Sequence, residues 1–137
     1  MSILLDTNVL SEAGKPSANR HVRAFLIGAS DLRISVVSIH EIEYGISLLP
    51  NGQRRSHLER DMAAIIATFG QWLIPVGEDE ARLAAHYRAD ARKRGRVLHL
   101  PDALIAATAK EHGLTLATRN LRDFNYLDID IVNPWAA

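Results

Sequence analysis

The amino-acid sequence predicts an α/β protein with a central, largely parallel sheet. Short apolar runs rich in β-branched residues alternate along the chain with longer stretches whose apolar residues recur at helical spacing. Such alternation is typical of strand–helix–strand units, which build parallel sheets with helices on their faces. The 137 residues contain no linker, repeat or low-complexity tract. We therefore expect a single domain over residues 1–137, since this length does not accommodate two independent cores.

Five short apolar runs are predicted to form the strands of this sheet. The third run contains Pro75, which favours an edge strand or the end of a strand because proline cannot donate to the ladder. Gly113 introduces the fourth run, and Asn133 and Pro134 end the fifth. The five predicted strands span residues 3–5, 33–37, 73–76, 114–118 and 129–132.

The stretches between these runs have the apolar periodicity of amphipathic helices. We expect Ser38 to be the N-cap of one helix, with Glu41 three residues later completing a capping box. Another helix begins with Pro101 and ends before Gly113, which is the asymmetry that helices prefer. The predicted helices span residues 19–27, 38–49, 57–69, 78–94 and 101–112, and residues 95–100 are expected to form a loop.

The composition excludes several classes of protein. Hydrophobic residues make up 47% and charged residues 23%, which is typical of a globular chain and excludes a disordered tail. Sixteen basic and sixteen acidic residues give no net charge, which argues against binding to nucleic acid through overall charge. The sequence has no cysteine, so disulfides, cysteine–zinc sites and thiol nucleophiles are excluded. Its first apolar run is too short for a signal peptide or membrane span, so we expect a cytoplasmic protein without a membrane partner.

Familiar catalytic motifs are also missing. There is no glycine-rich nucleotide motif and no GxSxG, so a nucleotide cofactor or a serine hydrolase has no support. None of the six histidines has the spacing of a zinc motif. Among them, His99 is the one expected nearest to a site, because it precedes the candidate acid Asp102 by three residues.

Polar residues gather instead where the predicted strands end. In a parallel α/β sheet, ligands bind at the carboxyl ends of the strands. Several carboxylates brought together there cannot all ionise cheaply unless a cation lies among them. Hard oxygen ligands suit Mg²⁺ or Mn²⁺, and a carboxylate-held divalent ion is a common device for phosphodiester hydrolysis. The residues in these positions are Asp6, Glu41, Glu43, Asp102, Thr118, Asn120 and Asp123.

Each acid also has a structural interpretation. Asp6 could cap the following helix, Asp102 could complement a helix dipole, and Asp123 could stabilise a turn. Glu41 and Glu43 differ by about 200° around a helix, so they cannot both face one site, and spacing does not choose between them. It is the joint position of the acids that favours a metal site over these alternatives.

A second candidate feature is basic. Arg88, Arg92 and Arg96 recur every four residues, a spacing that aligns side chains in one stripe on a helix. Such a stripe could contact the phosphates of RNA. The alternative is a solvated helix face, and Asp90 among the arginines dilutes their charge.

Four segments, which follow one another in order along the chain, resemble the motifs of PIN-domain ribonucleases. The resemblance is strongest to the toxins of VapBC-type toxin–antitoxin pairs, and the opening segment LLDTNVLSE is its most specific part. Residues 49–55 and the ending around Trp135 resemble the FitB-type branch, whose complex with its antitoxin binds DNA. The four segments are residues 4–12, 34–45, 101–109 and 116–124.

This resemblance implies a PIN-like three-layer α/β/α fold and a type II toxin that acts as an endoribonuclease dependent on Mg²⁺, with Mn²⁺ able to substitute. The metal-binding and catalytic residues would be Asp6, Glu41, Asp102 and Asp123. The family's glutamate stands four positions before a glycine, which selects Glu41 over Glu43. Some members carry the fourth acid at the position of Asn120, and others carry it three residues later, at the position of Asp123. Because residue 120 is not an acid here, we choose Asp123. The residues expected to orient the acids or water are Thr7, Asn8, Thr118 and Asn120.

The resemblance also implies partners. Such toxins usually form homodimers and are inhibited by a small antitoxin, which inserts a helix or an arginine-bearing tail near the acidic site. DNA would be bound only through the antitoxin complex. One alternative is a regulatory module that acts mainly through that complex on promoter DNA. A phosphatase or phosphoacceptor domain using Asp6 is a weaker alternative, because residue 8 is Asn and not the second Asp of the haloacid-dehalogenase-like motif.

Overall fold

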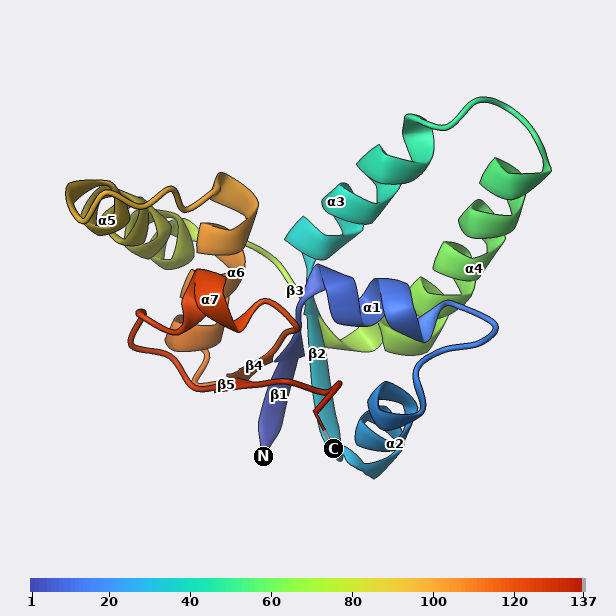
Figure 1. Cartoon of the computed structure of the whole chain (residues 1–137), viewed down its shortest axis with the longest axis horizontal. Helices are drawn as coiled ribbons and strands as arrows, with labels where there is room; N and C mark the ends of the chain where they lie inside the picture. Colours follow the sequence, from blue (N-terminus) through green and yellow to red (C-terminus); the bar gives the residue numbers. More distant parts are fainter. Residues whose placement is uncertain (137) are drawn as a thin grey trace.

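A computed structural model describes residues 1–136. It contains a five-stranded sheet in the order β3-β2-β1-β4-β5, in which every neighbouring pair is parallel (Figure 1). This confirms the predicted α/β class, and it places the first strand of the chain at the centre. The short β3 is an edge strand that ends directly before Pro75, as the proline predicts. The strands are β1 (Ser2–Leu5), β2 (Asp31–Ser35), β3 (Leu73–Ile74), β4 (Thr115–Ala117) and β5 (Ile131–Val132).

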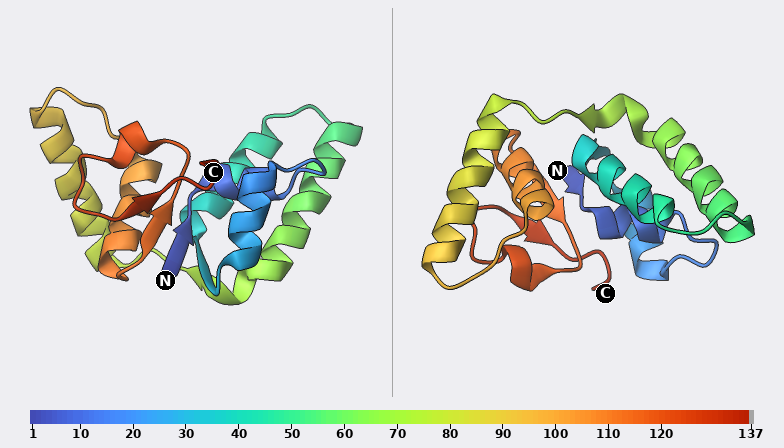
Figure 2. Two further views of the ribbon diagram at one scale, coloured as in Figure 1. Left: turned by 60° about the horizontal axis from the view of Figure 1, so that its bottom comes forward. Right: turned by 90° about the horizontal axis from the view of Figure 1, so that it is seen from above.

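Helices cover both faces of the sheet, which gives the predicted three-layer arrangement. Helices α5, α6 and α7 lie on one side, and α1, α2 and α4 lie on the other (Figures 1 and 2). Within the described residues, no helix combines the length and the hydrophobicity needed to cross a membrane. The helices are α1 (Thr7–Ala13), α2 (Arg20–Gly28), α3 (Val36–Ser47), α4 (Gln53–Phe69), the 3₁₀ turn η1 (Gly70–Trp72), α5 (Glu78–Lys93), α6 (Leu100–Glu111) and α7 (Leu121–Phe124).

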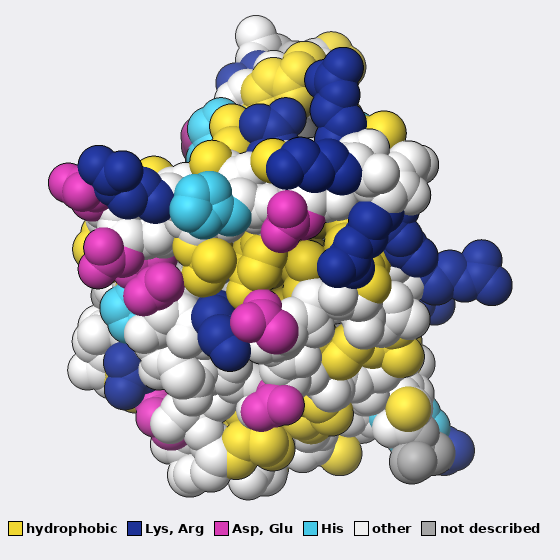
Figure 3. Space-filling view, turned by 90° about the vertical axis from the view of Figure 1, so that its left-hand side faces the viewer, with side chains coloured by type: hydrophobic (Ala, Val, Ile, Leu, Met, Phe, Trp, Pro, Cys, Tyr) yellow, Lys and Arg dark blue, Asp and Glu magenta, His cyan; other side chains and the backbone are white. Residues whose placement is uncertain are grey.

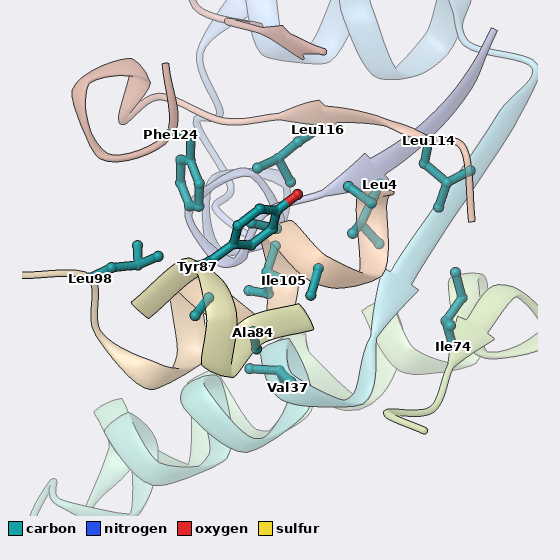
Figure 4. Packing of buried hydrophobic residues seen from close by; sticks show 14 of the residues in the cluster. Leu4, Val37, Ile74, Ala84, Tyr87, Leu98, Ile105, Leu114, Leu116 and Phe124 are labelled. Atoms are coloured by element: carbon teal, nitrogen blue, oxygen red, sulfur yellow. The ribbon is translucent and has the colours of Figure 1, made fainter. Parts of the chain in front are cut away.

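Strand β1 contributes to both cores because its side chains alternate between the two faces. Leu4 packs with α5, α6 and α7, whereas Ile3 and Leu5 pack with α1, α2 and α4. On the α5–α6 side, Tyr87 lies over the alanine-rich helix α6 among aliphatic side chains (Figure 4). All three β1 side chains are almost fully buried, so the central strand is fixed from both sides. The position of the residue that follows it, Asp6, is fixed with it.

The start of α3 differs from the prediction. Ser35, and not Ser38, is the N-cap, and its hydroxyl accepts a hydrogen bond of 3.0 Å from the Val37 amide. The predicted strand over 33–37 therefore lies at Asp31–Ser35, and the capping box of Ser38 with Glu41 is absent from the described α3. The β-branched run suggested a strand, but a serine in extended conformation at its centre ends the strand and starts the helix two residues early.

Other boundaries differ in the same local way. Helix α4 begins at Gln53, four residues before the predicted start, and β5 contains only the last two residues of its predicted run. Helix α5 ends at Lys93, one residue before the predicted end. Arg96 lies in the following loop, as the predicted bounds of that loop imply, so it does not continue a helical stripe with Arg88 and Arg92. The single-turn helix α7 was not predicted at all, because its four residues are too short for a periodic pattern.

Candidate metal-binding active site

Asp6 is the best-fixed polar group of the site. It follows the central strand β1, and its side chain is only 4% exposed. One carboxylate oxygen accepts a bond of 2.7 Å from the Thr7 amide, and the other accepts 2.7 Å from the Thr118 hydroxyl and 3.4 Å from the Asn8 side-chain amide. The carboxylate therefore caps α1 and is also held from the end of β4. The structural and the functional interpretation of Asp6 do not exclude one another.

Thr118 and Asn8 extend this network across the strand ends. The Thr118 hydroxyl oxygen also accepts a bond of 3.0 Å from the Asn120 amide, and Asn8 Oδ1 accepts 3.4 Å from the Arg119 amide. Thr7 donates to Asp6 only through its backbone amide. Its hydroxyl instead lies 3.0 Å from the hydroxyl of Ser38, which is fully buried. Ser38 thus connects the starts of α1 and α3 through its hydroxyl. The sequence pattern had instead predicted that Ser38 caps a helix.

Asp6 faces an open cleft that is lined by residues from α1, α3 and α6. The cleft has a volume of about 370 Å³. Glu41 from α3 and Asp102 from α6 line it, whereas Glu43 is exposed and is not among its lining residues. The complete lining consists of Asp6, Thr7, Asn8, Ser11, Glu41, His99, Pro101, Asp102, Ile105 and Asn120.

Asp123 occupies a different environment from the other acids. It lies on α7, its side chain is exposed, and it is not among the residues that line the cleft. Its charge nevertheless raises the pKa of both Asp6 and Asp102, so it lies near them. Asn120, the alternative fourth position, does line the cleft, and its amide is bound to Thr118. The structure thus brings Asn120 to the cleft wall and leaves Asp123 outside the lining, near enough for its charge to act on Asp6 and Asp102.

The electrostatics of the cleft favour uptake of positive charge. Burial raises the pKa of Asp102 to about 6, and the charges of Asp6, Asp123 and Glu41 add to the effect, while His99 opposes it. Burial also raises the pKa of Asp6, although the bonds from Thr118 and Thr7 oppose that shift. Both carboxylates are therefore costly to ionise without a cation nearby. Perturbed acids gathered in a cleft are typical of functional sites.

The chemical type of the ligand atoms in the cleft, which are carboxylate oxygens, suits a hard divalent cation. Carboxylate oxygens from three elements face one cleft, and no cysteine exists in the chain to favour a softer metal. Within residues 1–136, however, no three acidic or histidine side chains already stand close enough to form a finished ligand cluster. Asp6 is the acid of this group whose position is fixed by hydrogen bonds.

A second hollow opens beside the acidic cleft and was not predicted. It is a mostly apolar groove of about 460 Å³ between α1, α3 and α4. Thr7, Ser11 and Glu41 line both hollows, so the two are continuous. The sequence signal that could have located this groove is the helical spacing of its apolar lining residues, which are Ile42 and Ile46 on α3 and Leu58, Met62 and Ile65 on α4.

The three arginines of the predicted stripe do share one surface. Arg88, Arg92 and Arg96 line a shallow depression of about 390 Å³ beside the loop that follows α5. They do so although Arg96 is outside the helix. Figure 3 shows the side of the molecule that carries α5, with Lys and Arg side chains gathered toward its upper right and acidic ones mainly toward its left and lower parts.

Residues 3–129 match the PIN domain family model, and this chain belongs to that family. This confirms the resemblance seen in the sequence. The chain is 38% identical to "Toxin FitB" of Neisseria gonorrhoeae over 97% of its own length and 98% of that protein. It is 33% identical to "VapC ribonuclease Y4jK" of Sinorhizobium fredii over 97% of each. The solved structure "FitAB bound to IR36 DNA fragment" contains a chain 37% identical to it, with a TM-score of 0.86 over 98% of this chain and 96% of that one.

Proposed function

We propose that this protein is the toxin of a toxin–antitoxin pair and a divalent-metal-dependent endoribonuclease. The observation that carries the proposal is Asp6, buried at the end of the central strand, held by Thr118, and facing a cleft lined by Glu41 and Asp102. It is supported by membership of the PIN domain family and by similarity over nearly the whole chain to a FitB toxin and a VapC ribonuclease.

In this proposal, Asp6, Glu41, Asp102 and Asp123 hold Mg²⁺, with Mn²⁺ able to substitute. The bound ion would supply activation of the attacking water and neutralisation of charge on the phosphate. Thr118 keeps the Asp6 carboxylate pointing into the cleft, because its hydroxyl donates to the oxygen that Asn8 also contacts. Asn120, fixed at the cleft wall through its amide, is placed to hydrogen-bond a water or a substrate oxygen.

The antitoxin would occupy the apolar groove next to the cleft. That groove lies between α1, α3 and α4 and runs into the cleft at Glu41, so a helix seated in it can bring a basic side chain to the acids. An arginine among carboxylates forms charge-assisted hydrogen bonds and takes the place of a cation. DNA would then be bound through the antitoxin of the complex, a proposal supported by the similarity to FitAB, which has been solved bound to a DNA fragment. A homodimer of this chain is part of the same proposal.

Expression of the protein without its antitoxin tests the enzymatic part. Wild type and Asp6→Asn would be produced at matched levels, confirmed by blotting, with RNA ends mapped from the same cultures. We expect growth arrest and discrete RNA cuts with wild type only. A matched control is Asp79→Asn, an exposed acid at the start of α5 that does not line the cleft, which is expected to behave as wild type.

The alternative is a regulatory module that acts mainly through an antitoxin complex on promoter DNA, and the DNA-bound FitAB structure is the observation that favours it. Normal growth and intact RNA with soluble wild-type protein present would contradict the nuclease proposal. Retarded migration of promoter DNA by the complex of such a protein with its antitoxin would then support the regulatory alternative.

A further inference from the structure

We propose that the RNA strand crosses from the acidic cleft over His99 to the depression lined by Arg88, Arg92 and Arg96, so that His99 contacts the substrate. This inference rests on the proposed nuclease function and adds to it a path for the RNA on one side of the cleft. The acids of the cleft repel RNA, so the affinity for phosphates next to the cleavage site has to come from basic groups outside the acidic cluster.

His99 is placed for contact with substrate and is not required by the fold. It is the N-cap of α6, but among the described contacts its side chain makes no capping hydrogen bond. Ser, Thr, Asp and Asn are the residues that stabilise this position, so a histidine here contributes little to the helix. Its exposed imidazole lines the cleft, and among residues 1–136 it is the one cleft-lining side chain that can carry positive charge.

The arginine depression offers a prepared surface for a polyanion. Arg88 Nε donates to the Leu98 carbonyl at 3.2 Å, which fixes its side chain and leaves its terminal nitrogens available. Arg96 is stacked over the Tyr126 ring at 4.1 Å. Arg92 is exposed, and within residues 1–136 its guanidinium makes no hydrogen bond or ion pair, whereas its backbone carbonyl accepts a bond of 3.0 Å from the Gly95 amide. Two guanidinium groups are thus oriented before any ligand arrives, which lowers the entropic cost of binding phosphates.

The cleft and the depression meet at one short segment of chain. Leu98 lines the depression and its neighbour His99 lines the cleft, so a strand that passes from one to the other crosses this segment. Val97 and Leu100, which flank it, are 80% and 50% exposed. Such apolar side chains provide a surface on which an unstacked base can pack. Asp90 is the acid nearest to the arginines along α5, and its single negative charge does not balance the positive charge of three arginines.

Binding of RNA without turnover tests the arginine part. Asp6→Asn protein would be titrated into a fluorescein-labelled single-stranded RNA of mixed sequence, and anisotropy would be recorded at several salt concentrations. Adding Arg92→Ala should weaken binding and reduce the slope of log K against log salt by about 0.7, as loss of one phosphate contact does. Arg23→Ala, an exposed arginine on α2 across the sheet, is the matched control and should leave both unchanged.

Cleavage kinetics with otherwise wild-type protein test His99. We expect His99→Ala to lower kcat/KM roughly tenfold through loss of a hydrogen bond to a charged oxygen. His99→Gln should recover much of the lost kcat/KM, because the glutamine side-chain amide can donate the same hydrogen bond. A purely structural role would instead lower the melting temperature of both variants.

If the wild type cleaves RNA but Arg92→Ala binds it normally, or His99→Ala cleaves it normally, the proposed path is wrong. A change in oligomeric state with Arg92→Ala but none in RNA affinity would also overturn it. Absence of cleavage by wild type would instead contradict the nuclease function.

Discussion

The end of β1 and the segment after β4 carry two of the proposed metal ligands, Asp6 and Asp123, in very different environments. Asp6 is 4% exposed, and its carboxylate accepts three hydrogen bonds from Thr7, Asn8 and Thr118. Asp123 is exposed on a single turn of helix, and its influence on the other acids is through its charge. One acid is fixed before any cation binds, and the other is free to adjust. The difference suggests a site with a rigid centre that is completed when the cation arrives.

Lengthening each acid by one methylene would test this comparison most directly. We expect Asp6→Glu to lower the rate of RNA cleavage by more than about 100-fold, because the longer side chain cannot keep the bonds of the buried carboxylate. Asp123→Glu should remain within about 10-fold of wild type, because an exposed side chain can rearrange. Cleavage of a labelled RNA at saturating Mg²⁺ measures both. Equal losses in the two variants would contradict the distinction.

Removal of one hydroxyl tests how Asp6 is held. Thr118→Val deletes the donor to Asp6, and we expect cleavage to fall roughly 10- to 100-fold, as it does when the support of a ligand is lost. The free energy of unfolding should fall by about 1–3 kcal/mol, because the buried carboxylate loses a partner.

The matched control for that change is Thr108→Val. Thr108 is equally buried, but its hydroxyl donates to the Leu104 carbonyl at 2.7 Å within α6, away from the acids. We expect this variant to cleave RNA at the rate of wild type. If both valine variants lost activity to the same extent, general destabilisation and not the orientation of Asp6 would be the cause.

The smallest expected effect concerns stability and pH. Burial and the neighbouring acids raise the pKa of Asp102 to about 6 from 3.8, so the folded protein holds this proton more tightly than the unfolded chain. The associated stability is present below the unfolded value and is lost as the pH rises through about 6. Without metal, Asp102→Asn should therefore raise the free energy of unfolding near pH 7 by on the order of 1 kcal/mol, since partial solvent access weakens the effect.

Urea denaturation in EDTA would measure this effect. The advantage of Asp102→Asn should shrink as the pH falls toward about 4, where the wild-type carboxyl is protonated in the folded protein. Asp90→Asn, on the exposed surface of α5, should show no such dependence. A destabilised Asp102→Asn protein near pH 7 would mean that the carboxylate is already compensated without a cation.

The sequence predicted the fold class and the candidate acids, but it did not predict where the acids lie relative to the cleft. Alternating strands and helices indicated the parallel sheet, and the residues after the strands indicated the acids. Periodicity could not indicate α7, and therefore could not show that Asn120 lines the cleft whereas Asp123 lies outside its lining. It also placed a cap at Ser38, because the choice between Ser35 and Ser38 depends on where β2 stops pairing, and its last pair joins Ser35 to Ile74 of β3. Strand pairing is long-range information that local patterns do not carry.

The bond between Thr118 and Asp6 joins residues 112 positions apart in the chain. During translation at about 5–20 residues per second, the segment that carries Thr118 is made on the order of 10 seconds after Asp6. Until β4 has emerged from the ribosome and paired with β1, the carboxylate lacks its support and the central strand lacks one neighbour. A nascent chain therefore cannot present the finished site, and an incomplete fragment released early lacks it altogether. In the proposed toxin, the order of synthesis itself would delay activity until almost the entire polypeptide exists.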